Sequence, residues 1–237
     1  MRDAVQKGVS RLEHDGLMHA DMIWLAAVGL QRFGRQVWMA DLEGYARDPY
    51  VSRSVAMRGL ASAIVGQPRL DAVELQSLDD SPNAGLAVAL HCDILGVPEM
   101  WANHWDQALR KGGHAITYAL LEAVFARERG CPLPRSPAYV ARLEREVAAL
   151  IVPDGRTSNL EIEAAWILTL AGRGSMVARS FLGDVLDAQW NDGGWAVDET
   201  KRETGWEPTA HAVLWLTEQL DAPKAGILGL GPPLQTP

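Results

Sequence analysis

The chain reads VLDAQWNDGGW over residues 185–195 and AHAVLWLTEQL over residues 210–220, and these two stretches decide the fold. The first ends an amphipathic segment that starts at Met176, and the second is mainly apolar. Within the first stretch, Gln189 can cap a helix end, the paired glycines permit a tight turn, and Trp195 can stack on the preceding helix. The sequence therefore predicts a helical hairpin in which an amphipathic helix precedes an apolar one.

The same alternation recurs along the chain, and strand signals are nearly absent. Amphipathic segments cover residues 2–13, 36–47, 70–78, 99–109, 138–150 and 176–188. The apolar helices that follow them are expected to begin near His19, Ser52, Asn83, His114, Asn159 and Thr209. A helix that is apolar all round must be covered on both sides, and a ring of inner helices within a ring of outer helices provides that cover.

We therefore predict an all-α fold, an α/α-toroid of about six helical hairpins, in preference to an open TPR- or HEAT-like stack. Residues 1–221 are expected to form this single domain. Residues 222–237 are rich in Gly and Pro, and they are expected to form an extended tail.

The motif at residues 189–195 resembles the Gln-x-x-Asp-Gly-x-Trp repeat of squalene-hopene cyclases and related terpene cyclases. Residues 206–216 resemble the inner helix that follows this repeat in terpene cyclases and protein prenyltransferases. The resemblance implies an α/α-toroid and isoprenoid or other natural-product chemistry, with a lyase, isomerase or transferase favoured. Two acidic motifs of terpene cyclases are incomplete here, because residues 77–80 read SLDD and residues 79–83 read DDSPN.

Polar residues stand at the expected starts of several inner helices. In a toroid these starts point toward one mouth of the central cavity, so residues that are distant in sequence converge there. His114 and His211 occupy equivalent places before apolar runs, and Glu163 lies one helical turn after Asn159. We take His114, Glu163, His211 and Asp21 as candidate catalytic residues, since enclosure shifts imidazole and carboxylate pKa values toward neutrality.

The set of His114, Glu163 and His211 also suits a metal site. Two imidazoles and a carboxylate could hold Zn or Fe and leave a coordination position open for water or substrate. The resemblance adds that protein prenyltransferases carry a zinc-binding histidine where His211 stands, although the aspartate–cysteine pair that completes their site has no counterpart near Asp192. The plain structural interpretation is that polar residues cap helix starts.

An apolar ligand in the central cavity would bind against apolar or aromatic side chains. Trp24, Trp166 and Trp215 fall on the expected inner helices and are candidate substrate-binding residues, because aromatic faces stabilise cationic centres. Asn83 and Asn159 are the candidate polar contacts to the same ligand. Core packing is the alternative role for the three tryptophans.

The composition of this 237-residue chain excludes some classes of binding partner. Its net charge of −8 argues against a nucleic-acid partner, and no apolar run reaches the ~18 residues of an integral membrane segment. Cys92 and Cys131 are too few for a disulfide scaffold, so Cys92 is expected to be an isolated packing residue. A reducing, cytoplasmic location fits best.

The leading hypothesis is an enzyme that acts on a small, largely apolar molecule in the central cavity. A non-catalytic binding or scaffold protein, or a partner subunit of a biosynthetic complex, is the alternative. The sequence leaves the oligomeric state open, a homo-oligomer included.

Overall fold

The computed structural model shows a mainly helical chain, as predicted. It describes residues 1–15, 55–56, 58–60, 70–78, 82–152, 154–197 and 204–220. The inner helix expected near His19, the helix start expected at Ser52, the candidate residues Asp21 and Trp24, and the tail at 222–237 lie outside these residues, whereas residues 55–56 and 58–60 after Ser52 are helical. No helix in the described ranges is long and apolar enough to cross a membrane.

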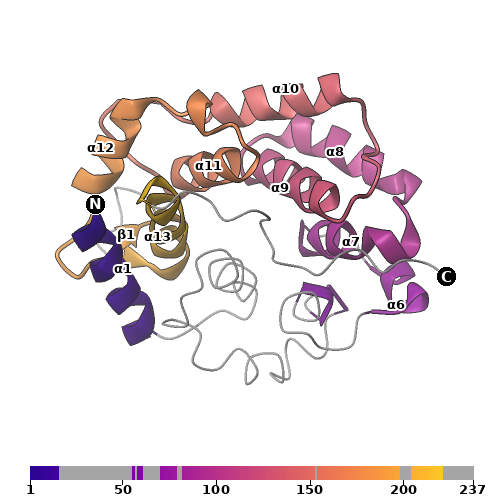
Figure 1. Ribbon diagram of the computed structural model, residues 1–237, viewed down its shortest axis with the longest axis horizontal. Helices are drawn as coiled ribbons and strands as arrows, with labels where there is room; N and C mark the ends of the chain where they lie inside the picture. The colour runs from indigo at the N-terminus through magenta and orange to yellow at the C-terminus, as the bar shows by residue number, and fades with distance from the viewer. Residues whose placement is uncertain are drawn as a thin grey trace.

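Four helices form an inner row that positions the candidate site. They are α7 (Pro82–Leu95), α9 (His114–Glu128), α11 (Asn159–Leu170) and α13 (Trp206–Leu220), and each contacts the next in that order (Figure 1). All four begin close to the starts predicted from the sequence. Ten of the fifteen residues of α9 and nine of the twelve residues of α11 are buried, so these helices are covered on more than one side.

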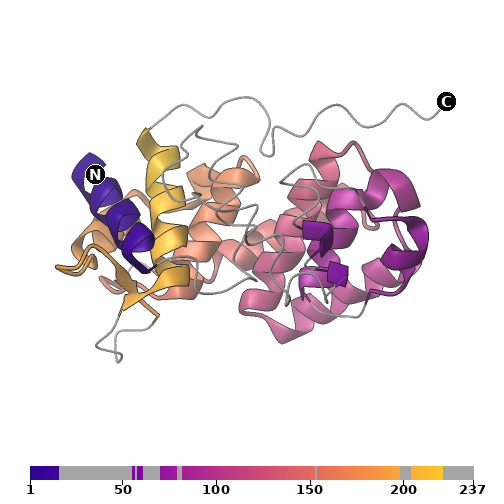
Figure 2. The same cartoon turned by 90° about the horizontal axis from the view of Figure 1, so that it is seen from below.

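Shorter or more polar helices lie outside this row (Figures 1 and 2). They are α6 (Ala72–Gln76), α8 (Glu99–Lys111), α10 (Pro137–Ala148), the 3-10 helix η2 (Gly174–Met176) and α12 (Arg179–Asp187). Helix α8 packs on α9, and α10 packs on both α9 and α11. Outer and inner helices therefore alternate along the chain from α8 to α13, which confirms the predicted alternation in this region.

Local signals in the sequence fix where α10 and α11 begin. The Ser136 side chain accepts a hydrogen bond from the Tyr139 amide, and Pro137 occupies the first helical position. Ser158 and Glu161 form a reciprocal capping box at the start of α11. The start of α11 matters most, because it sets the rotation that carries Glu163 toward the neighbouring inner helices.

Helix α1 (Arg2–Asp15) packs against α13, so the first and last described helices are neighbours (Figure 1). Val5 and Val9 are buried at this contact. The Gln189 side chain donates hydrogen bonds of 2.8 Å to the carbonyl oxygens of Ala4 and Gly193. Gln189 therefore ties α1 to the turn that leads into α13.

The turn before α13 contains a two-stranded antiparallel sheet that the sequence did not predict. Strands β1 (Trp195–Ala196) and β2 (Thr204–Gly205) are its members. The buried Trp195 indole donates a 2.8 Å hydrogen bond to the Val185 carbonyl oxygen near the end of α12, so Trp195 contacts the preceding helix as expected. Gly193 has a φ of +90°, a conformation that glycine adopts readily, and it lies against the Lys7 backbone of α1.

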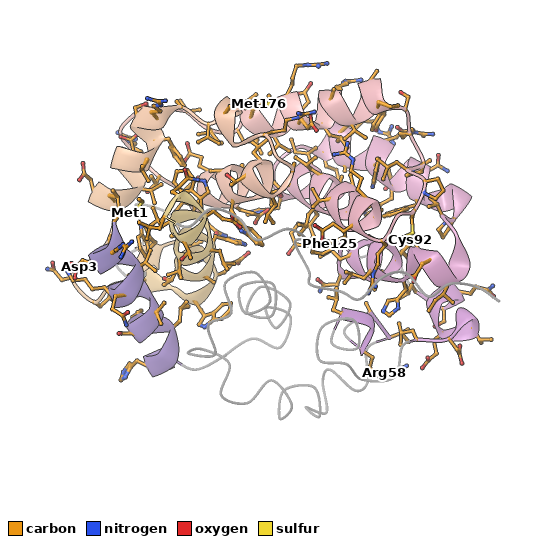
Figure 3. The ribbon with its side chains drawn as sticks, viewed as in Figure 1. Met1, Asp3, Arg58, Cys92, Phe125 and Met176 are labelled. Atoms are coloured by element: carbon orange, nitrogen blue, oxygen red, sulfur yellow. A yellow bond between two sulfur atoms is a disulfide. The ribbon has the colours of Figure 1, made fainter. Side chains whose placement is uncertain are left out.

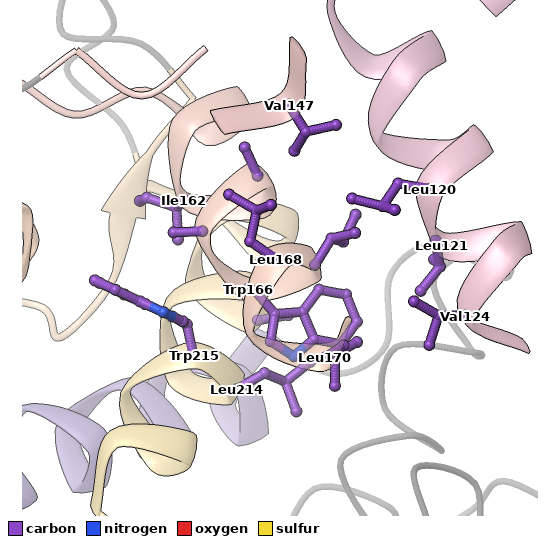
Figure 4. Close-up of a cluster of buried hydrophobic side chains, with 14 of the residues drawn as sticks. Leu120, Leu121, Val124, Val147, Ile162, Trp166, Leu168, Leu170, Leu214 and Trp215 are labelled. Carbon is purple, nitrogen blue, oxygen red and sulfur yellow. The ribbon is translucent and has the colours of Figure 1, made fainter. Parts of the chain in front are cut away.

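The hydrophobic core lies between the inner helices and their covering layer (Figure 4). Leu120 and Leu121 of α9 face Trp166 of α11, and Leu214 and Trp215 of α13 complete the cluster on its other side. These side chains are 2% exposed or less. Burial of each of these large apolar side chains stabilises the fold by about 1.5–3 kcal/mol.

A disulfide joins Cys92 of α7 to Cys131, which follows α9 (Figure 3). The expectation that Cys92 is an isolated packing residue is therefore wrong. The sequence alone could not reveal the pair, because the two positions become neighbours only when α7 packs along α9. Disulfides persist in oxidising compartments, so the number of cysteines no longer supports a reducing one.

A link between the inner row and the outer helix α8 centres on the buried carboxylate of Glu122 in α9. Both indole N–H groups of Trp101 and Trp105 in α8 donate to Glu122 Oε2, at 2.6 and 2.8 Å. His104 Nε2 lies 3.2 Å from Glu122 Oε1. The carboxylate fits beside α7 because Gly85 has no side chain, since a Cβ there would lie 2.1 Å from Glu122 Oε1. This cluster is a structural brace between α7, α8 and α9.

Candidate functional site

Three of the predicted catalytic residues come together at the N-terminal ends of α9, α11 and α13. Glu163 lies in the first turns of α11 and is 1% exposed. Its Oε2 atom is 2.9 Å from His114 Nδ1, at the first residue of α9. The buried Thr117 hydroxyl donates to the other oxygen, Glu163 Oε1. Neighbouring inner helices thus place an imidazole and a hydroxyl on a single buried carboxylate.

His211 supplies the second imidazole from α13, and it is 1% exposed. Its Nδ1 lies 3.0 Å from Asn159 Oδ1. An amide oxygen only accepts hydrogen bonds, so Nδ1 carries the proton and the lone pair of the neutral ring stays on Nε2. The Trp166 ring lies 5.6 Å from the His211 ring, centroid to centroid, and forms an apolar wall beside it.

The structure adds Glu207, which the sequence analysis did not select. One ligand atom from each of Glu163, Glu207 and His211 lies within 4.8 Å of the others. Glu207 precedes His211 by four residues on α13, so the two share one face of the helix. That Glu-x-x-x-His spacing was the available signal in the sequence. His114 contacts Glu163 but does not belong to this group of three.

Burial and charge act differently on the two imidazoles. The hydrogen bond with Glu163 raises the pKa of His114, against the opposing effect of partial burial. The His114 side chain is 50% exposed, so it forms the solvent side of the cluster. Burial lowers the pKa of His211, although the charges of Glu163 and Glu207 act in the opposite direction. His211 is therefore neutral over a wider pH range than His114.

The predicted substrate-binding residues have different surroundings. Trp166 and Asn159 belong to the cluster through His211. Trp215 lies in the core, where its indole donates to the Thr169 hydroxyl at 3.1 Å and its ring lies 5.5 Å from Phe181. Asn83 lies in the first turn of α7, and within the described residues it makes no hydrogen bond to the cluster.

The arrangement has two chemical capacities. A buried carboxylate that contacts an imidazole can hold that ring in position for proton transfer. Two carboxylates and a neutral imidazole can instead ligate a divalent cation. Searches of protein-family models, curated proteins and solved structures found no match to this chain.

Proposed function

We propose that this chain is an enzyme that acts on a small, largely apolar molecule through the His114, Glu163 and His211 side chains. The observation that carries the proposal is the contact of a buried carboxylate with an imidazole at 2.9 Å, across two inner helices. Glu163 positions His114 for proton transfer. His211, which lies on the next inner helix, offers a neutral imidazole to the same region.

The substrate class rests on two features. Trp166 places an aromatic wall beside His211, and such a wall suits an apolar or transiently cationic group. The likeness of residues 189–195 to the repeat of terpene cyclases adds the isoprenoid or other natural-product class. A lyase or isomerase fits best, because acid–base groups alone perform those reactions, whereas a transferase needs a second substrate.

We also propose that the hairpins close into an α/α-toroid. Support comes from the neighbouring order α7, α9, α11 and α13 and from the packing of α1 on α13, which brings the two ends of the described fold together. Ring closure would enclose the starts of the inner helices and concentrate their polar residues. A crystal structure tests this closure, and an open superhelix would contradict it.

The experiment for the enzymatic proposal is a conversion screen with a matched control. Purified protein is incubated with linear isoprenoid alcohols, isoprenoid diphosphates and cyclic terpenoids, and products are identified by mass spectrometry. We expect conversion by the wild-type chain and its loss by about 10²–10⁴-fold in Glu163→Gln. Glu146→Gln, an exposed carboxylate on α10, should retain full conversion. Equal conversion in both variants would contradict the role of Glu163.

A non-catalytic scaffold protein, alone or as a subunit of a biosynthetic complex, is the second candidate. It is favoured by the tight filling around the cluster, where Trp166 is completely buried. Among the described residues, a pocket of about 260 Å³ is lined by Arg156, Asp187 and Trp190, and none of the cluster residues lines it. If no compound is converted and none changes the tryptophan fluorescence on titration, the scaffold interpretation replaces the enzymatic one.

A further inference from the structure

We propose that Glu163, Glu207 and His211 bind a divalent transition-metal ion. This ligand set differs from the set of His114, Glu163 and His211 expected from the sequence, because Glu207 takes the place of His114. The proposal shares Glu163 and His211 with the proposed enzyme, but metal binding is measured without any substrate. Each step below starts from contacts among the described residues.

The first support is distance. One oxygen of Glu163, one oxygen of Glu207 and one nitrogen of His211 lie within 4.8 Å of one another. Ligands of a zinc ion lie at about 2.0–2.2 Å from the metal, which puts neighbouring ligand atoms roughly 3–4 Å apart. Small side-chain rotations, without any movement of the helices, can therefore bring the three atoms around one ion.

The second support is the orientation of His211. Asn159 Oδ1 lies 3.0 Å from Nδ1 and holds the proton on that nitrogen. Metal-binding histidines commonly donate their other ring N–H to an oxygen acceptor, which fixes the ring and increases the basicity of the ligating nitrogen. Within the described part of the chain, Nε2 has no hydrogen-bond partner. Nε2 is thus the nitrogen that is free to bind a cation.

The third support is the closeness of two carboxylates, one of which has no partner among the described residues. Glu163 has His114 and Thr117 as partners, whereas Glu207 makes neither a hydrogen bond nor an ion pair through its side chain in the described ranges. Two carboxylates in close proximity repel each other, and burial strengthens that repulsion. A divalent cation would neutralise both groups. Helix N-termini also favour acidic residues, but they do not account for the imidazole of His211 within 4.8 Å of both carboxylates.

The donor set indicates which metals fit. One imidazole nitrogen and two carboxylate oxygens match Zn²⁺, Mn²⁺ or Fe²⁺ better than Ca²⁺, which takes six to eight oxygen ligands. Three protein ligands leave a coordination position for water or for an oxygen atom of a substrate. The half-exposed His114 ring contacts Glu163 at the solvent side of this ligand set.

The test uses the 237-residue chain with affinity tags removed. The protein is treated with a chelator, dialysed, and titrated with ZnCl₂ and MnCl₂ by calorimetry, and bound metal is counted by elemental analysis. We expect one equivalent of one of these metals in the wild type. Glu207→Gln should weaken its binding more than about 10-fold, and Asn159→Ala should weaken it by about 10–100-fold. Glu146→Gln should bind as the wild type does.

A second readout separates a true site from adventitious binding and from misfolding. Cobalt(II) replacement should give a visible absorption band that His211→Gln alters, because only a nitrogen ligand is then lost. Circular dichroism and thermal unfolding verify that each variant is folded. Absence of stoichiometric binding, or unchanged binding in Glu207→Gln, overturns the proposal.

The two proposals fail separately. Conversion of a substrate by a protein that binds no stoichiometric metal would overturn the metal site and leave the acid–base role of Glu163 intact. Stoichiometric metal that depends on Glu207 would uphold the metal site even if no substrate in the screen is converted.

Discussion

Replacement of Gly193 by alanine tests the contact between α1 and the turn before α13. Gly193 has a φ of +90°, which costs a residue with a Cβ atom about 1–2 kcal/mol. The added Cβ would also lie 2.5 Å from the Lys7 carbonyl oxygen, well inside the 3.4 Å at which ordinary contact begins. That oxygen belongs to the backbone, so either α1 or the turn must move.

The size of the effect follows from these two contributions. Overpacking of a tight contact costs about 1–3 kcal/mol, so Gly193→Ala is expected to lower the free energy of unfolding by about 2–5 kcal/mol in total. Gly172→Ala is the matched control. Its φ is +75°, but nothing lies within 4 Å of the added Cβ, so only the backbone cost of about 1–2 kcal/mol applies.

Urea unfolding of the two variants gives the difference, and hydrogen exchange measured on peptides from residues 1–15 shows where it arises. We expect faster exchange of the α1 amides in Gly193→Ala and no change there in Gly172→Ala. Equal destabilisation by the two substitutions, with α1 equally protected, would refute the close approach of Gly193 to Lys7.

Three further outcomes are expected. The disulfide joins Cys92 and Cys131, which are 39 residues apart in the sequence. Its reduction should lower the free energy of unfolding by about 2–4 kcal/mol. Urea titrations with and without reductant measure this, and a double serine variant that still responds to reductant would contradict it. Glu122→Ala should cost about 2–6 kcal/mol, because two buried indole N–H groups lose their acceptor at 1–3 kcal/mol each. Glu122→Gln keeps an acceptor oxygen and should cost less in the same titration, and the reverse order would count against the brace. Burial alone would raise the pKa of Asp192. Hydrogen bonds from the Gly194 amide and the Thr204 hydroxyl, together with the charge of Arg11, outweigh this effect of burial, so the pKa of Asp192 is lowered. The stabilisation is therefore present above about pH 4 and is lost as the pH falls through the lowered pKa. Asp192→Asn should flatten the acid limb of the stability–pH curve, and an unchanged limb would reject this assignment.

The inner helices could be predicted because their signal is local. A run that is apolar on all sides requires cover on all sides, and α9 and α11 begin at the predicted His114 and Asn159. Their boundaries rest on capping and on composition, both of which are properties of neighbouring residues. Whether further hairpins complete a ring depends on long-range packing, and that part of the fold stays a prediction.

The candidate site was predictable in part for the same reason. His114, Glu163 and His211 were selected because the starts of parallel inner helices are neighbours in space, and the structure does place them in one cluster. Glu207 was missed because an acidic residue in a first helical turn has an ordinary electrostatic explanation. Only the packing of α11 on α13 brings it to Glu163.

The remaining differences between the sequence predictions and the structure concern the direction in which two tryptophans face and the pairing of two cysteines. Trp166 and Trp215 both lie on inner helices, but helix rotation turns Trp166 toward His211 and Trp215 toward Phe181 of α12. Two isolated cysteines gave no sign that they would pair. These features depend on rotations and on distances between helices, which a pattern of apolar residues does not encode.

The bond from Gln189 to the Ala4 carbonyl oxygen joins positions 185 residues apart, and this has a consequence for synthesis. At about 5–20 residues per second, a ribosome needs roughly 10–40 s to make the intervening chain. Throughout that time the apolar side of α1, with Val5 and Val9, lacks its docking surface on α13. In the nascent protein, α1 must therefore be shielded by transient contacts or by a chaperone until α13 has been synthesised.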